Sequence, residues 1–175
     1  MSASRRCAWR RDGTLEGMTT HLVLPIGPTV LKELRTADDA GRPPAAMTDE
    51  EGGAPLRCCL RHSAPGERIA LVSYAPLRRW AARTGAEPGA YDEQGPVFIH
   101  AEECPGPAGD AVPFTNSHRV LRRYSADGRI LGGRLVADAD AFRPALTEAF
   151  ADPEVALVHV RAVEYGCFLY EVRRA

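Results

Sequence analysis

Apolar residues along the chain gather in short runs, and most of these runs have the composition of β-strands. β-branched and aromatic residues are frequent in them, which favours extended backbone. A run near the end of the sequence is interrupted at Glu164-Tyr165-Gly166 and therefore predicts two strands, one on each side. The other candidate strands lie at residues 21–24, 56–61, 68–74, 95–100, 117–124 and 129–136.

A longer spacing of apolar residues predicts two or three helices. Phe142, Leu146 and Phe150 recur every four residues, so they share one face of a helix that ends at about Phe150. Proline is favoured in the first turn of a helix, and it opens the two other candidates. These candidates span residues 28–35 and 76–83.

Short turns join the predicted strands. Asp127-Gly128 is a strong hairpin signal, and the turn at Pro65-Gly66 predicts that residues 56–61 pair with residues 68–74. Because such links join antiparallel neighbours, we predict an α+β fold. It has a single, mainly antiparallel sheet of six or seven strands, with two or three helices packed on it. Residues 36–53 are expected to form a long polar loop.

The two ends of the chain differ in character. Residues 1–17 lack periodicity and carry many small or charged side chains, so we expect them to be disordered. Met18 directly precedes the first predicted strand and is an alternative to Met1 as the start of the protein. A length of 175 residues is typical of one domain. We therefore expect residues 18–175 to form a single α+β domain.

Charge and composition exclude several classes of protein. The formal net charge is −1, so there is no general attraction to nucleic acid or to an anionic membrane. No apolar run approaches the roughly eighteen residues of a membrane span, and no secretory signal is recognisable. The 5 cysteines are an odd number, which favours reduced thiols in a cytoplasmic protein. We predict no nucleic-acid partner and no membrane partner.

No strong catalytic motif is present. The sequence lacks a glycine-rich phosphate loop, Cys-x-x-Cys, His-Glu-x-x-His and Gly-x-Ser-x-Gly. What it offers is a set of cysteine, histidine and arginine side chains on or beside the predicted strands. Strand alternation places His159 and Arg161 on one face, opposite Val158 and Val160. Buried polar groups need partners, so a site is expected here if the protein has one.

Thiol chemistry is one use of these residues. A thiolate at Cys58 or Cys59 would be the nucleophile, and His100 or His159 would move the proton. Arg161 would bind an anionic substrate. The alternative is that His159 and Arg161 are structural groups with a partner on a neighbouring strand.

Ligand-binding residues are predicted around the same strands. They are Arg161, Cys167 and Tyr124. Tyr124 directly precedes the predicted hairpin turn, a position that also suits an edge aromatic residue.

Metal binding is a further alternative, although no cofactor is predicted outright. His100-x-x-x-Cys104 leaves the end of a predicted strand, and imidazole with thiolate suits zinc. Cys58 and Cys59 are adjacent, so on a strand only one of them would reach a shared site. The competing interpretation is that the cysteines are unliganded core residues.

Several segments resemble a known family, and they occur in one collinear block from about Thr20 to Ala175. They are DDAGRP at 38–43, PLRCCLR at 55–61, PGERIALVSY at 65–74, GPVFIH at 95–100, DPEVALVHVR at 152–161 and GCFLY at 166–170. This pattern resembles a bacterial family of uncharacterised proteins, the domain of unknown function 1203. The resemblance implies a small single-domain bacterial protein and implies no reaction.

Taken together, the sequence favours a pocket lined by cysteine, histidine and arginine that binds a small, anionic molecule, with or without thiol-dependent chemistry. The alternatives are a non-catalytic interaction or structural domain and a domain that binds zinc through cysteine and histidine.

Overall fold

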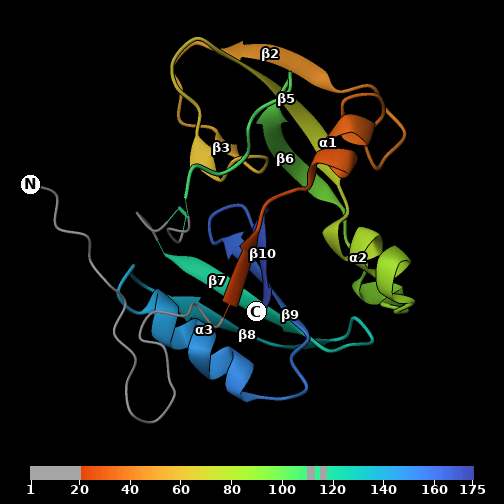
Figure 1. The fold of residues 1–175 in the computed structure, drawn as a ribbon, viewed down its shortest axis with the longest axis vertical. Coiled ribbons are helices and arrows are strands. Elements are labelled where there is room, and N and C mark those ends of the chain that lie inside the picture. Colours follow the sequence, from red (N-terminus) through yellow and green to blue (C-terminus); the bar gives the residue numbers. More distant parts are fainter. Residues whose placement is uncertain (1–20, 110–112, 115–117) are drawn as a thin grey trace, which may run out of the picture.

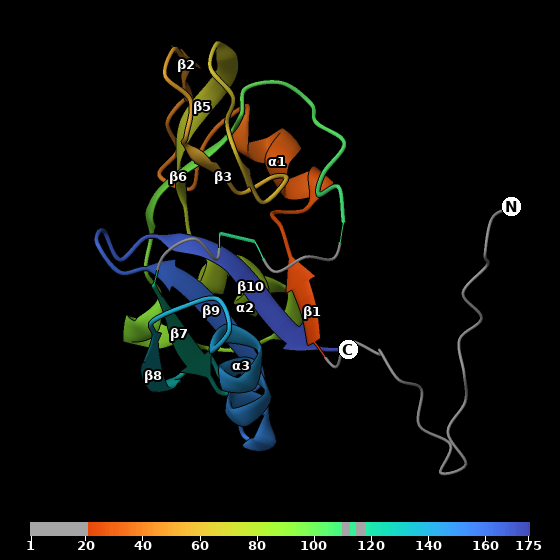
Figure 2. The ribbon, with the colours of Figure 1, turned by 90° about the vertical axis from the view of Figure 1, so that its left-hand side faces the viewer.

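A computed structural model of the chain describes residues 21–109, 113–114 and 118–175. These residues form two five-stranded sheets and three α-helices (Figures 1 and 2). The segment 1–17, predicted to be disordered, and Met18 lie outside the described residues. No helix among the described residues is long and apolar enough to cross a membrane.

Sheet 1 contains both ends of the described chain. Its strand order is β1-β10-β9-β7-β8, and all its neighbouring strands are antiparallel. The predicted hairpin at Asp127-Gly128 and the predicted terminal pair of strands are confirmed, as β7–β8 and β9–β10. The strands are β1 (His21–Leu24), β7 (Arg119–Tyr124), β8 (Ile130–Val136), β9 (Leu157–Ala162) and β10 (Phe168–Arg174).

Sheet 2 is formed from the intervening part of the chain. Its strand order is β2-β5-β6-β3-β4, in which the pairing of β3 with β6 is parallel and the others are antiparallel. In Figure 1 it lies above sheet 1. The strands are β2 (Ala45–Asp49), β3 (Pro55–Leu56), β4 (Arg61–His62), β5 (Glu67–Tyr74) and β6 (Gly95–His100).

The predicted single sheet of six or seven strands is therefore wrong, although the α+β class is confirmed. The apolar pattern identifies strands but does not state which strands pair, because pairing is decided by contacts between distant segments. Phe168 of β10 shows how the two sheets meet, since its side chain packs in the core of sheet 2. Its carbonyl oxygen accepts a hydrogen bond of 2.9 Å from Nε of the buried Arg57.

The helices cover three apolar faces. α3 (Phe142–Ala151) packs on the face of sheet 1 that carries Val158 and Val160, as the alternation of β9 requires. α2 (Pro76–Thr84) packs against the opposite face of sheet 1, and α1 (Pro28–Leu34) packs on sheet 2. A short 3₁₀ helix, η1 (Gly89–Tyr91), follows α2.

Two predicted elements differ from the structure. Residues 57–60 are a turn between the two-residue strands β3 and β4, so residues 56–61 do not form one strand paired with residues 68–74. The backbone of Leu60 has φ of 58°, which a strand does not allow, and its N–H donates to the carbonyl of Leu56. The predicted loop at 36–53 contains β2, an edge strand with mostly exposed side chains, which pairs with β5 and lacks an apolar signal of its own.

Candidate metal centre

The turn between β3 and β4 brings two adjacent sulfur atoms to one side of the chain. Cys58 Sγ and Cys59 Sγ lie 4.0 Å apart, and both residues are buried. The expectation that adjacent cysteines point to opposite faces is wrong, because it assumed a strand. In a turn that closes at Leu60, successive side chains do not alternate.

His100, the last residue of β6, faces both sulfur atoms. Its Nδ1 lies 3.2 Å from Cys58 Sγ and 3.8 Å from Cys59 Sγ. The backbone N–H of His100 donates a hydrogen bond of 3.3 Å to Cys58 Sγ. Since β3 pairs with β6 through Leu56 and Phe98, the sheet itself positions the turn beside His100.

Cys104 completes a cluster of four. It lies in the loop after β6, is half-buried, and packs against the core of sheet 2. The ligand atoms of Cys58, Cys59, His100 and Cys104 all lie within 4.8 Å of one another. We refer to these four residues as the Cys/His cluster.

Three separations within the Cys/His cluster are close to those of a tetrahedral zinc site. Zn–S bonds of about 2.3 Å and Zn–N bonds of about 2.0–2.1 Å imply roughly 3.8 Å between two sulfur ligands and roughly 3.6 Å between sulfur and nitrogen. The observed separations are 4.0 Å between the sulfur atoms of Cys58 and Cys59, and 3.2 and 3.8 Å from these to Nδ1 of His100. All three agree with the tetrahedral values within a few tenths of an ångström.

The pKa values of the two adjacent thiols shift in opposite directions. A hydrogen bond from Cys58 lowers the pKa of Cys59 to about 6, with help from the backbone N–H of Arg61 and the charges of His100 and Arg61. The same hydrogen bond and burial raise the pKa of Cys58. In the metal-free protein these shifts favour a thiolate at Cys59 over one at Cys58.

The outer nitrogen of His100 has two charged neighbours. Its Nε2 lies 3.2 Å from Nη2 of Arg61 and 3.6 Å from Oε1 of Glu67, and the side chain is 14% exposed. Arg61 and Glu67 form an ion pair of 2.6 Å. A carboxylate on the far nitrogen is the usual support for a metal-bound histidine, and Glu67, at 3.6 Å, lies just beyond hydrogen-bond distance of this nitrogen.

His159, the other predicted catalytic histidine, lies elsewhere. It is fully buried on β9 against Tyr124 and Phe168, with ring centroids 4.7 and 5.0 Å away. Its Nε2 lies 3.5 Å from Oε2 of Glu171, its cross-strand partner, which is longer than an ordinary hydrogen bond. Burial lowers the pKa of His159, and this effect outweighs the nearby carboxylate.

Arg161 and Cys167, predicted to bind a ligand, line a pocket of about 200 Å³ between β9 and the start of β6. Tyr124 does not line it. Its ring is fully buried between His159 and α2, and burial raises the pKa of its hydroxyl. The structure thus separates the predicted residues into the Cys/His cluster, the buried His159 region and the Arg161 pocket.

Three charged residues around these sites were not singled out from the sequence. Arg61 and Glu67 flank His100, and Glu93 pairs with Arg161. The sequence could have indicated Glu67, because this residue directly precedes the clear strand pattern at residues 68–74. Glu93 lies in a polar stretch that gives no such indication.

Comparisons with known proteins add a family but no activity. The sequence model of a family described as "Protein of unknown function (DUF1203)" matches residues 53–174, which is more than two thirds of the chain. This range runs from β3 to β10 and includes the whole Cys/His cluster and the Arg161 pocket. No curated protein and no solved structure matches the chain.

Proposed function

The chain belongs to the DUF1203 family of proteins of unknown function, and on that premise we propose that it is a zinc-binding domain with a structural metal at the Cys/His cluster. The ligands are Cys58, Cys59, His100 and Cys104. One observation carries the proposal: three thiols and an imidazole converge from two segments of the chain with their ligand atoms within 4.8 Å.

The choice of metal follows from the ligand set. Three sulfur atoms and one nitrogen suit Zn²⁺, whereas Mg²⁺ and Ca²⁺ take oxygen ligands. Four protein ligands leave no open position for a reacting water, which is the arrangement of a structural site. Burial of Cys58 and Cys59 supports the same role.

A metal at this place would reinforce elements that pair over only one or two residues. β3 and β4 have only two residues each, and the loop after β6 has no regular structure around Cys104. Zinc would tie the turn at Cys58 and Cys59 to the end of β6. Such a link contributes directly to the stability of the fold.

Zinc binding also fixes the proton on His100. With the metal on Nδ1, Nε2 would carry the imidazole hydrogen and donate it to Glu67. The guanidinium of Arg61, which can only donate, would then turn away from Nε2. Arg61 then remains paired with the carboxylate of Glu67.

The direct test is metal content in a matched pair of variants. Tag-free protein expressed with zinc should contain about one zinc per chain by plasma mass spectrometry, and Cys104→Ser should lose most of it. Cys167→Ser is the control, since both cysteines are half-buried and only Cys104 belongs to the cluster. Metal-free wild-type protein that does not bind added zinc, or Cys104→Ser that retains it, contradicts the proposal.

A second candidate function is favoured by one observation, the position of Cys59 Sγ 3.8 Å from Nδ1 of His100, where the pKa of the thiol is lowered. In this alternative Cys59 is a nucleophilic thiolate supported by His100 and Arg61, with no metal. The metal analysis separates the two, because a zinc-bound thiolate is not free to react.

A further inference from the structure

A second site lies outside the Cys/His cluster and shares no residue with it. It is the pocket of about 200 Å³ formed where the two sheets meet. One wall comes from the end of β5 and the start of β6, and the other from β9 and the turn that leads to β10. Arg161 is its one lining residue with a positive charge.

The charges around Arg161 do not balance. Arg161 and Arg122 each direct Nη1 at the same carboxylate oxygen of Glu93, at 2.6 Å for Arg122. Two cations thus share one anion, and the Arg161 side chain is only 11% exposed. This arrangement leaves a net positive charge at the pocket, and burial together with the charge of Arg122 lowers the pKa of Arg161. A further anion in the pocket would offset it.

The guanidinium of Arg161 is held in place by its other contact. Its Nε donates a hydrogen bond of 2.8 Å to the carbonyl of Gly166, in the turn between β9 and β10. Among the described residues, Nη2 has no acceptor with hydrogen-bond geometry. Arg161 therefore keeps one donor group for a ligand while its position is fixed.

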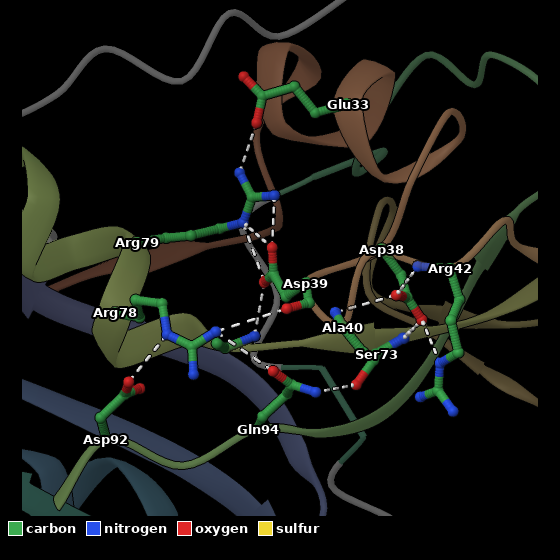
Figure 3. A network of polar contacts seen from close by, with 11 residues as sticks. Glu33, Asp38, Asp39, Ala40, Arg42, Ser73, Arg78, Arg79, Asp92 and Gln94 are labelled. Atoms are coloured by element: carbon green, nitrogen blue, oxygen red, sulfur yellow. Dashed lines mark hydrogen bonds and ion pairs between the residues drawn. The ribbon is translucent and has the colours of Figure 1, made fainter.

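The opposite wall is fixed by a polar network (Figure 3). Arg78 of α2 donates to Asp92 at 2.8 Å and to Gln94 at 3.2 Å, and Gln94 donates to Ser73 at 2.8 Å. Glu93, between Asp92 and Gln94, points the other way and reaches sheet 1. Because these hydrogen bonds already restrict the side chains of this wall, ligand binding costs little further conformational entropy.

Aromatic rings and prolines supply the apolar part of the pocket lining. Tyr74 and Phe168 contribute aromatic rings whose centroids are 5.5 Å apart, and Pro76 and Pro96 lie beside them. A cavity of about 150 Å³ is known to hold one benzene molecule, so about 200 Å³ suits a single ring with one small substituent.

We infer that this pocket binds a small organic monoanion with a flat apolar body, of the class of the aromatic carboxylates. The anionic group lies on Arg161 and the ring lies against Tyr74 and Phe168. The net excess of one positive charge selects a monoanion over a dianion.

Benzoate and benzamide are the probes for this inference, since they have nearly the same shape and differ in charge. In a titration of the full chain followed by amide chemical shifts, benzoate should bind saturably and shift the amides of Gly95 and Gly166. Benzamide should bind at least about tenfold more weakly. Benzoate that does not saturate, or that binds no better than benzamide, overturns the inference.

Two variants that break the same ion pair separate ligand binding from structure. Arg161→Gln should weaken benzoate binding about tenfold, whereas Glu93→Gln should strengthen it, because it removes the anion that competes for Arg161. If Arg161→Gln does not fold, Glu93→Gln decides alone, because benzoate affinity that does not rise in this variant contradicts the inference. Equal effects of the two variants on benzoate affinity contradict the inference, and Cys104→Ser should leave the affinity unchanged.

Discussion

Asp39 and Arg79 form the most extensive ion pair in the described part of the chain (Figure 3). Both carboxylate oxygens of Asp39 accept from the guanidinium of Arg79, with the shortest separation, to Nη2, at 2.7 Å. Asp39 also accepts from the backbone N–H of Ala75, which precedes α2. The pair thus anchors the segment between α1 and β2 to the start of α2.

Removal of this anchor should be costly. Asp39→Ala leaves the guanidinium of Arg79 without its main partner in a site where the two side chains are only 18% and 10% exposed. We expect the free energy of unfolding to fall by about 2 to 4 kcal/mol, measured by urea denaturation. Glu33→Ala is the matched control, because Glu33 contacts the same arginine but is 57% exposed, and it should cost less than about 1 kcal/mol. An equal decrease in the free energy of unfolding in the two variants would contradict this prediction.

The fold could be predicted wherever a signal was local. The hairpin at Asp127-Gly128, the helix through Phe142 and Phe150, and the terminal strand pair are all confirmed. β2 was missed because its side chains are mostly exposed and its short sequence, Ala-Ala-Met-Thr-Asp, contains no run of β-branched or aromatic residues, so that only its partner β5 holds it extended. The division into two sheets was missed for the same reason, since sheet membership depends on pairing between distant segments.

Glu67 should support the proposed metal through His100. Glu67→Ala removes the only described carboxylate within reach of Nε2, at 3.6 Å, and we expect zinc affinity to fall about 10- to 100-fold. Competition with a chromophoric chelator measures this change. Glu51→Ala, on an exposed glutamate outside the cluster, should have no effect. Unchanged affinity in Glu67→Ala would show that His100 does not rely on this carboxylate.

Cys59 should be the reactive thiol of the metal-free protein. Because its pKa is lowered to about 6, its alkylation rate should rise through pH 6, whereas Cys58, whose pKa is raised, should stay unreactive at neutral pH. Mass spectrometry after iodoacetamide treatment resolves the two sites. Added zinc should suppress the reaction at Cys59. A rate that rises only near pH 8.5, the range of an ordinary thiol, would refute the assigned hydrogen bond between the thiols.

His159 should make stability depend on pH. Its pKa is lowered by burial, so below about pH 6.5 the unfolded state binds a proton that the folded state does not. Stability from this group is complete above pH 6.5 and decreases as pH falls, by at most about 1.4 kcal/mol per pH unit. His159→Phe should therefore flatten the plot of unfolding free energy against pH between about 5 and 6.5. The plot keeps some slope, because the pKa values of His21 and His62 are lowered too.

A slope identical to that of the wild type would mean that the imidazole of His159 is protonated in the folded protein. The comparison is best made by urea denaturation at several pH values, with pH 8 as the reference at which His159 is neutral in both states.

The members of the candidate sites could be named from the sequence, but their grouping could not. Residue type alone marks Cys58, Cys59, His100 and Cys104 as candidates. Their convergence depends on the turn that closes at Leu60, and the apolar pattern there is that of a strand. Arg161 was expected beside a cysteine nucleophile, yet it belongs to a separate pocket with Glu93, a residue without a sequence signal.

The strand order of sheet 1 constrains when the two sheets can form during translation. β1 lies at the edge of that sheet and has β10 as its neighbour, so every other described strand is synthesised between the two partners. Sheet 2 takes its five strands from one uninterrupted stretch, β2 to β6, and can close while translation continues. A nascent chain that stalls before β10 has therefore completed one sheet and holds β1 without its partner, where chaperones or proteases can reach it.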